Sequence, residues 1–295
     1  MLNKYIKQTQ KKLEKTVKNN NKSLLKKPYT FLASFLRPVY FSREFLMIRG
    51  IKTRNHSNYT SILFFTVHKS ASTFVKNTIF KLVEKKLQPI QFGGLLSPQQ
   101  QNILFTNAEK MKNILNPKGY VYGAFRSYYD FPGLDKYKIV LLLRDPRDVL
   151  TSQYFSTLFN HPLATKAFFE KRKKYQDYTI DEFVLEMAPS FQKKYADYIE
   201  HFLHKPNVLF LKYEDMVTDF GPWLKKISDF LDLKDNEDKL QEIVSKTSFK
   251  VNKEDKKNFI RNITPGDHIR KLKPETIANL NQLFEQELRQ LNYVI

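Results

Sequence analysis

The chain has 295 residues, of which 41% are hydrophobic and 14% aromatic, so we expect a folded protein with a sizeable core. Its formal net charge of +20 favours anionic partners without naming one. The absence of cysteine excludes disulfides, thiol nucleophiles and cysteine-based zinc sites, and six scattered histidines indicate no metal site. No stretch approaches the roughly 18 consecutive apolar residues of a spanning helix. The Lys-rich start lacks a secretory pattern, so we expect a cytoplasmic protein.

The first 58 residues predict a basic extension. Residues 1–27 carry nine lysines and a single acid, Glu14, over a weak helical stripe of apolar side chains. The simplest interpretation is a solvated terminal helix, and the alternative is an arm that makes peripheral contact with an anionic surface such as a membrane. Residues 28–58 predict an irregular connection. We therefore divide the chain into a basic N-terminal helical extension, residues 1–58, and one domain, residues 59–295.

Residues 61–87 (SILFFTVHKSASTFVKNTIFKLVEKKL) predict a buried strand, a short polar turn and an amphipathic helix. The run at 62–67 is apolar, β-branched and aromatic, which is typical of a parallel strand covered on both faces. The turn at 68–73 contains a lysine and hydroxyl side chains where the helix begins. Unpaired backbone N–H groups and a partial positive charge at a helix N-terminus favour an anion. This P-loop-like unit is our first candidate binding element.

Later segments alternate between the same two patterns. Further strands are predicted at residues 120–125 (YVYGAF), 138–143 (KIVLLL) and 207–211 (NVLFL). Helices are predicted at 149–159, 179–204 (broken at Pro189), 223–231, 238–245 and 274–291, and turns at 88–98. Asp145 and Pro146 suit the N-cap and first position of a helix. The alternation predicts an α/β fold, a three-layer αβα arrangement with a central, mostly parallel sheet and ligands at the carboxyl ends of its strands.

The turn at 68–73 differs from a Walker A loop, because the pattern GxxxxGK[ST] is absent. The strongest strand is followed by Arg144 and not by the Asp that would hold magnesium. These departures disfavour magnesium-dependent nucleotide hydrolysis and a nucleotide kinase. They favour a metal-free site built from basic side chains and backbone N–H groups.

Five motifs occur in order along the chain. Residues 68–74 (HKSASTF) match the loop P-K-S-G-T-T-W, and residues 144–152 (RDPRDVLTS) match R-x-P-R-D-x-x-x-S. Residues 211–216 (LKYEDM), 247–249 (TSF) and 261–268 (RNITPGDH) are similar to L-x-Y-E-D-M, T-S-F and R-K-G-x-x-G-D-W. With these motifs, residues 61–293 resemble the sulfotransferases that use 3′-phosphoadenosine 5′-phosphosulfate (PAPS), with motifs of the cytosolic type.

The resemblance implies transfer of a sulfonate group from PAPS to an acceptor hydroxyl or amine, with release of PAP and without a metal. It implies that Lys69 is catalytic and stabilises the charge that develops on the bridging oxygen. It also implies that Arg144, Ser152 and Arg261 clamp the 3′-phosphate. The implied donor-binding positions are Lys69, Ser70, Ala71, Ser72, Thr73, Phe74, Arg144, Ser152, Tyr213, Thr247, Phe249, Arg261 and Asn262.

The resemblance does not supply the general base. Cytosolic relatives place a His in K-T-H-L-P, where this chain has residues 122–126 (YGAFR), and Golgi-type members use a Glu where it has residues 91–94 (QFGG). His161 is our candidate for the catalytic base, because a neutral imidazole suits proton removal near pH 7. A solvated loop histidine is the structural alternative.

Other residues near these motifs leave further alternatives open. His68 and Asp130 are weaker candidates for the base, and Arg126 either holds an anionic acceptor or pairs with Asp130. Aromatic and basic residues between 155 and 178 predict part of an acceptor site for a small molecule, a lipid or a glycan. Two competing functions remain, a PAPS- or PAP-binding protein without activity and a basic nucleic-acid-binding protein. Nucleic acid is not expected as a partner, because the clearest strands are apolar throughout and offer no stacking platform.

Overall fold

A single parallel sheet forms the centre of the molecule. The computed structural model describes residues 38–51, 53, 57–160, 166–233, 237–249, 254–255 and 261–294. Within these residues five strands pair in the order β2-β3-β1-β4-β5, and each neighbouring pair is parallel. The strands are β1 (Ile62–Thr66), β2 (Gln88–Ile90), β3 (Tyr120–Phe125), β4 (Lys138–Leu143) and β5 (Val208–Lys212). The predicted α/β fold with a central sheet is confirmed.

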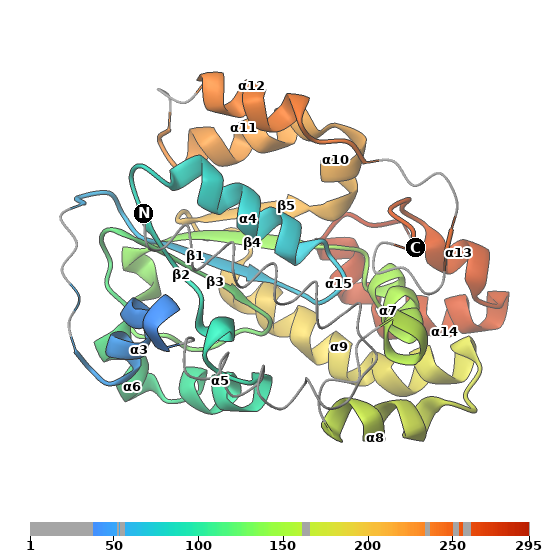
Figure 1. Cartoon of the computed structure of the whole chain (residues 1–295). Coiled ribbons are helices and arrows are strands. Elements are labelled where there is room, and N and C mark those ends of the chain that lie inside the picture. The colour runs from blue at the N-terminus through green and yellow to red at the C-terminus, as the bar shows by residue number, and fades with distance from the viewer. Residues whose placement is uncertain are drawn as a thin grey trace, which may run out of the picture.

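Helices cover both faces of the sheet (Figure 1). Helices α4, α11 and α12 lie on one face, α9 lies on the other, and α7, α13 and α14 gather beside the carboxyl ends of the strands. The helices are α3 (Ser42–Ile48), α4 (Ser72–Val83), α5 (Pro98–Phe105), α6 (Ala108–Ile114), α7 (Pro146–Phe155), α8 (Lys166–Tyr175), α9 (Ile180–Phe202), α10 (Tyr213–Thr218), α11 (Phe220–Phe230), α12 (Glu237–Ser245), α13 (Asp267–Lys271), α14 (Pro274–Leu283) and α15 (Glu285–Gln290). Short turns η2 (Phe92–Gly94) and η3 (Leu134–Lys136) and a π-helical segment η4 (Ser156–Asn160) complete the described elements.

The central strands are buried on both faces, which explains their continuous apolar runs. Along β1, Ile62 and Phe64 pack with α4 and α11, while Leu63 and Phe65 pack with α9. Strand β4 alternates between the same two clusters. The side chain of each residue is therefore buried against a helix layer, whichever face of the sheet it points to.

Two predicted helices have different limits from those expected. The predicted break at Pro189 is wrong, because α9 continues through this residue to Phe202. Pro189 is exposed, so water can solvate the carbonyl that loses its N–H partner, while the opposite, buried face holds the helix in place. The predicted C-terminal helix is divided at Phe284 into α14 and α15. The predicted cap is confirmed, since the Asp145 side chain accepts a hydrogen bond from the Arg147 N–H at 2.9 Å.

Two stretches expected to be irregular contain regular elements. Residues 88–98 include β2, a three-residue edge strand that exists because its backbone pairs with β3. Residues 28–58 include α3, whose Met47 is buried in the core and whose Glu44 Oε1 accepts a hydrogen bond from the Gln91 N–H at 2.9 Å. Residues 1–37 lie outside the described residues, so the basic helix and the division at residue 58 stay predictions.

Two candidate features are absent from the described part of the chain. None of its helices combines the length and the apolar content that crossing a bilayer requires. Its His, Asp and Glu side chains form no group of three that could hold a metal ion.

Candidate active site

Cationic side chains from three distant segments meet at one edge of the sheet. Strand β1 lies between β3 and β4, and all three strands run in the same direction. The chain leaves β1 at His68 and Lys69, β3 at Arg126 and β4 at Arg144. Because the carboxyl ends of parallel strands meet at one edge, these side chains are neighbours.

The turn after β1 prepares the start of α4 for an anion. Lys69 and Ala71 have positive φ angles of 66° and 55°. The Ala71 conformation costs an L-residue roughly 1–2 kcal/mol, and the loop of the resembling family has glycine here. The Ser70 hydroxyl lies 2.7 Å from both the Val67 carbonyl and Thr66 Oγ1, so it holds the turn together. No side chain caps α4, which leaves its first N–H groups, those of Ser72 and its successors, available to a ligand.

Lys69 lies in a strongly cationic environment. Its side chain is half-buried. Burial lowers the pKa of Lys69 to about 8, and the nearby Arg144, Arg261 and Arg126 add to this effect. A bound anion would offset this repulsion, so the turn favours a ligand with several negative charges.

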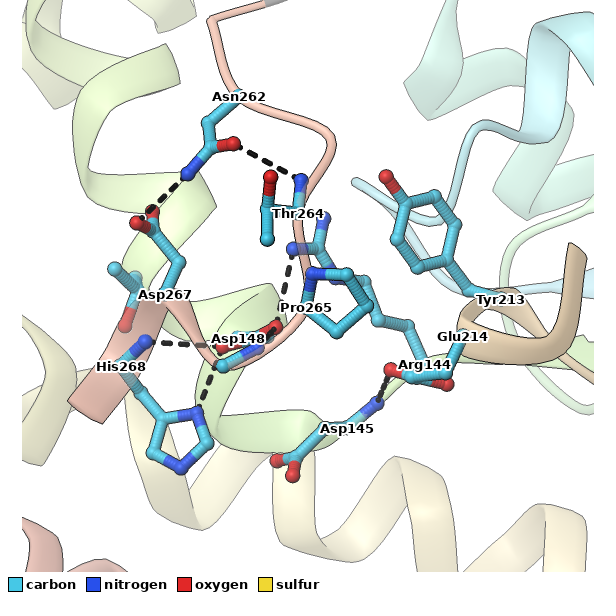
Figure 2. A network of polar contacts seen from close by, with 12 residues as sticks. Arg144, Asp145, Asp148, Tyr213, Glu214, Asn262, Thr264, Pro265, Asp267 and His268 are labelled. Atoms are coloured by element: carbon cyan, nitrogen blue, oxygen red, sulfur yellow. Dashed lines mark hydrogen bonds and ion pairs between the residues drawn. The ribbon is translucent and has the colours of Figure 1, made fainter. Parts of the chain in front are cut away.

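Arg144 joins this turn to α7. Its Nη1 donates to the Lys69 carbonyl at 3.1 Å, and its Nη2 donates to Asp148 Oδ2 at 3.2 Å. The guanidinium lies 4.3 Å from the centre of the Tyr213 ring (Figure 2). Its Nε is buried and has no hydrogen-bond partner among the described residues. Arg144 therefore holds an unsatisfied donor where the predicted phosphate clamp needs one.

Asp148 fastens the late segment 261–268 to α7 (Figure 2). Its carboxylate accepts hydrogen bonds from the Gly266 N–H at 2.9 Å, the His268 N–H at 3.0 Å and His268 Nδ1 at 2.7 Å. Burial alone raises the pKa of Asp148, but the bonds from His268 and Arg144 outweigh it and hold the pKa below its ordinary value. The motif contained Asp148, but its role as a hub could not be read from the sequence.

The late segment brings Arg261 and Asn262 to the same site. Arg261 is buried, forms ion pairs with Glu254 and Asp267, and lies 4.0 Å from the centre of the Phe155 ring. The Asn262 amide donates to Asp267 Oδ1 at 3.0 Å and accepts a hydrogen bond from the Thr264 N–H at 2.9 Å. Asn262 therefore shapes the loop that carries Arg261.

Three half-buried aromatic rings lie beside the start of α4. The Phe74 ring centre lies 5.7 Å from that of Phe220 and 5.3 Å from that of Phe249. Phe220, at the start of α11, was not predicted as a site residue and belongs to no motif. The Thr247 hydroxyl donates to the Ile243 carbonyl at 2.7 Å and so ends α12. Ser152 lies one turn after Asp148 along α7, so the two side chains are on the same face of the helix.

Another motif residue, Glu214, joins segments of the chain through hydrogen bonds. Glu214 Oε1 accepts a hydrogen bond from the Asp145 N–H at 3.0 Å, and its Oε2 accepts one from the Tyr293 hydroxyl at 2.9 Å. Through Glu214, Tyr293 therefore helps to hold the turn that follows β4. Helix α9 contributes two buried tyrosines with no motif around them. The Tyr195 hydroxyl donates to the Arg144 carbonyl at 2.5 Å, and that of Tyr198 donates to the Thr66 carbonyl at 2.8 Å.

The three candidates for the general base lie in different surroundings, and one of them is not described by the structure. His161 lies outside the described residues. The His68 ring is open to water yet largely surrounded by protein, and burial together with Arg126 and Lys194 lowers its pKa to about 3. Its Nδ1 lies 3.5 Å from Arg126 Nη1, so His68 is a poor proton acceptor near pH 7. Asp130 is exposed and accepts a hydrogen bond from the Tyr128 hydroxyl at 3.3 Å, and the described residues show no ion pair between Asp130 and Arg126.

Comparison with known proteins gives consistent results. Residues 131–292 match a family model described as "Sulfotransferase domain". Luciferin sulfotransferase of Photinus pyralis is 33% identical over 131 residues, which cover 42% of this chain and 33% of that protein. Flavonol 3-sulfotransferase of Flaveria bidentis is 25% identical over 231 residues, covering 74% of this chain and 70% of that protein.

One solved structure shows the same fold. It is that of mouse sulfotransferase SULT7A1 complexed with PAP, with a TM-score of 0.55 and 19% identity, covering 81% of this chain and 90% of that chain. The family match begins after the turn at 68–73, so the assignment of that turn depends on its own geometry. The match extends over more than half of the chain, from the approach to β4 through the late segment, and the chain therefore belongs to the sulfotransferase domain family.

Proposed function

We propose that this chain transfers a sulfonate group from PAPS to the hydroxyl, or the amine, of a small-molecule acceptor and releases PAP. The observation that carries the proposal is the direct bond between Arg144 and the Lys69 carbonyl, which joins an anion-binding turn to an arginine clamp. Two adjacent cationic sites suit a donor that carries a 5′-phosphosulfate and a 3′-phosphate. ATP has no 3′-phosphate and would leave the clamp unused.

At the first site, the N–H groups of Ser72 and Thr73 and the Lys69 ammonium bind the phosphosulfate. The acceptor oxygen attacks sulfur and forms a new S–O bond, while the bond between sulfur and the bridging phosphate oxygen breaks. The electron pair of that bond stays on PAP, where Lys69 stabilises the charge. The acceptor proton passes to a general base, for which His161 remains our prediction.

At the second site, Arg144, Ser152 and Arg261 bind the 3′-phosphate. The buried, unpaired Nε of Arg144 supports this role, because a phosphate oxygen would satisfy it. Phe74, Phe249 and Phe220 contact the adenine, and Tyr213 orients Arg144 through its ring.

The acceptor class is the open part of this proposal. The printed names of relatives mention luciferin and flavonol, which are small molecules, and this supports a small-molecule acceptor here. Lipid and glycan acceptors, the contact of residues 1–27 with an anionic surface, and a cytoplasmic location stay predictions.

The experiment that tests the proposal is a screen with ³⁵S-labelled PAPS against phenols, alcohols, sugars and amines. We expect label transfer by the wild-type protein and its loss in the Lys69→Ala variant. A protein that binds PAP but transfers label to no acceptor would be the binding protein without activity. Affinity for a mixed-sequence oligonucleotide that survives moderate salt, with no affinity for PAP, would favour the nucleic-acid alternative.

We also expect the affinity for PAP to fall as the pH rises above about 8. Burial and the nearby arginines lower the pKa of Lys69 to about 8 in the protein without a donor, and a bound anion raises it again. Below that pH Lys69 is charged in both states. Above it, binding must take up a proton, so the affinity falls by up to about tenfold per pH unit.

Calorimetry at pH 7 and 9, in buffers of different ionisation enthalpy, measures this proton uptake. The Lys69→Met variant is the control, because it has no proton to take up at this position. Equal uptake in the wild-type protein and the variant would assign the titration to another group.

A further inference from the structure

A second group of cations lies beside the proposed donor site. Arg126 follows β3, Lys171 lies on α8 and Lys194 lies on α9. All three side chains are half-buried. Each is close enough to His68 to lower the pKa of its ring, and Arg126 and Lys171 also lower the pKa of Lys194. The end of β3, α8 and α9 therefore each place a positive charge near His68.

None of these three cations forms an ion pair with a carboxylate of the described residues. Asp197 on α9 raises the pKa of Lys194, but its ion pair is with Lys193, and Glu186 pairs with Lys174. Lys194 Nζ lies 5.6 Å from the centre of the Phe191 ring, and Arg126 contacts the neutral ring of His68. Burial lowers the pKa of Arg126, of Lys171 and of Lys194, so holding these charges together costs free energy that a bound anion would offset.

The proposed clamp residues differ in this respect. Arg144 pairs with Asp148, and Arg261 pairs with Asp267. Each clamp arginine therefore has a carboxylate in direct contact, while none of the three cations around Arg126 has one in the described chain.

The strand order separates this group from the proposed donor site. Strand β1, which carries Lys69, lies between β4, which carries Arg144, and β3, which carries Arg126. An anion at Arg126 would thus lie across Lys69 from the 3′-phosphate clamp. In an in-line displacement the acceptor approaches sulfur from the side opposite the leaving phosphate, so this is the acceptor side.

We propose that Arg126, Lys171 and Lys194 bind a fixed negative charge on the acceptor. The acceptor is then an acidic hydroxyl compound that carries a carboxylate, sulfate or phosphate group. The guanidinium of Arg126 suits two-point binding of such a group, and the lysines act as point charges. This inference rests on the proposed function for the identity of the reaction, but the binding it predicts does not require turnover.

The test compares acceptors that differ only in charge. The probes are 4-hydroxyphenylacetate against 4-hydroxyphenylacetamide, and glucuronate against glucose, each assayed with saturating PAPS. We expect the acidic member of a pair to have at least a tenfold higher kcat/KM. The same pairs are titrated by calorimetry into the PAP-loaded protein, which measures preference even where no label is transferred.

Variants assign the preference to the three cations. In Lys171→Gln/Lys194→Gln we expect the preference for the acidic member to fall about tenfold while PAP affinity changes less than twofold. In Arg126→Gln we expect a similar fall in this preference. The matched control is Lys173→Gln/Lys193→Gln, which removes two exposed lysines from the same helices. Equal binding of acidic and neutral members, no binding of either, or equal losses in the control would overturn the inference. Preferential binding of the acidic members without transfer would contradict the proposed function alone.

Discussion

Replacing Lys69 by Ala is expected to lower kcat for sulfonate transfer by about 10²–10³-fold, the usual effect of losing one group that stabilises developing charge. The affinity for PAP should fall by less than about tenfold, because the N–H groups at the start of α4 and the clamp around Arg144 remain. The reason for this difference is that the bridging oxygen gains its charge only as the bond to sulfur breaks.

Single-turnover transfer from labelled PAPS and calorimetric titration with PAP measure the two quantities separately. Lys81→Ala is the control, because Lys81 is an exposed lysine of α4, the helix that follows the turn with Lys69. Unchanged kcat in Lys69→Ala would remove Lys69 from the reaction. Equal losses in kcat/KM and PAP affinity, with kcat preserved, would reduce its role to binding.

Replacing Asp148 by Asn should lower the free energy of unfolding by about 3–5 kcal/mol, the usual cost of removing one partner of a buried ion pair. The amide keeps the shape of the carboxylate but lacks its charge and half of its acceptors. It cannot satisfy Arg144 together with the N–H groups of Gly266 and His268. Because these bonds position Arg144 and the loop with Arg261, we expect PAP affinity to fall at least tenfold.

The pH dependence of the free energy of unfolding tests the role of Asp148 independently. The pKa of Asp148 is lower in the folded protein than in the unfolded chain, so its stabilisation is present above about pH 4 and is lost as the pH falls further. Denaturant unfolding between pH 3 and 7 should show this loss in the wild-type protein and a shallower one in Asp148→Asn. Asp229→Asn is the control, since Asp229 pairs with Lys225 on the surface and should matter little. If Asp148→Asn had the stability and PAP affinity of the wild-type protein, Asp148 would not be needed to position Arg144 and the loop with Arg261.

Local patterns in the sequence were sufficient for the strands and the first motif. Strands β3 and β4 have the predicted limits, β1 ends one residue earlier than predicted, and β5 is shifted by one residue at both ends. These strands can be predicted from the sequence, because burial on both faces requires an unbroken apolar run, which is a local property. The short edge strand β2 was missed, because only its pairing with β3 makes it a strand.

For the site, too, the sequence predicted the residues and the structure supplied their arrangement. Residue types and spacing were enough to nominate Lys69, Arg144 and Arg261, and the structure brings them close enough for the two arginines to lower the pKa of Lys69. The family match supports the assignment for residues 131–292, and the individual binding roles stay proposals until they are tested.

The order of most strands and helices, and the chemistry available at each turn, follow from local patterns of residues. How those turns meet could be known only from the fold: Asp148 joins α7 to the late segment, Tyr195 on α9 bonds the Arg144 carbonyl, and Arg126 lies beside His68. The physical reason is that hydrogen bonds and charge pairs act over a few ångströms in space. Residues separated by some 50 to 120 positions become partners only after the sheet has set which strand ends are adjacent.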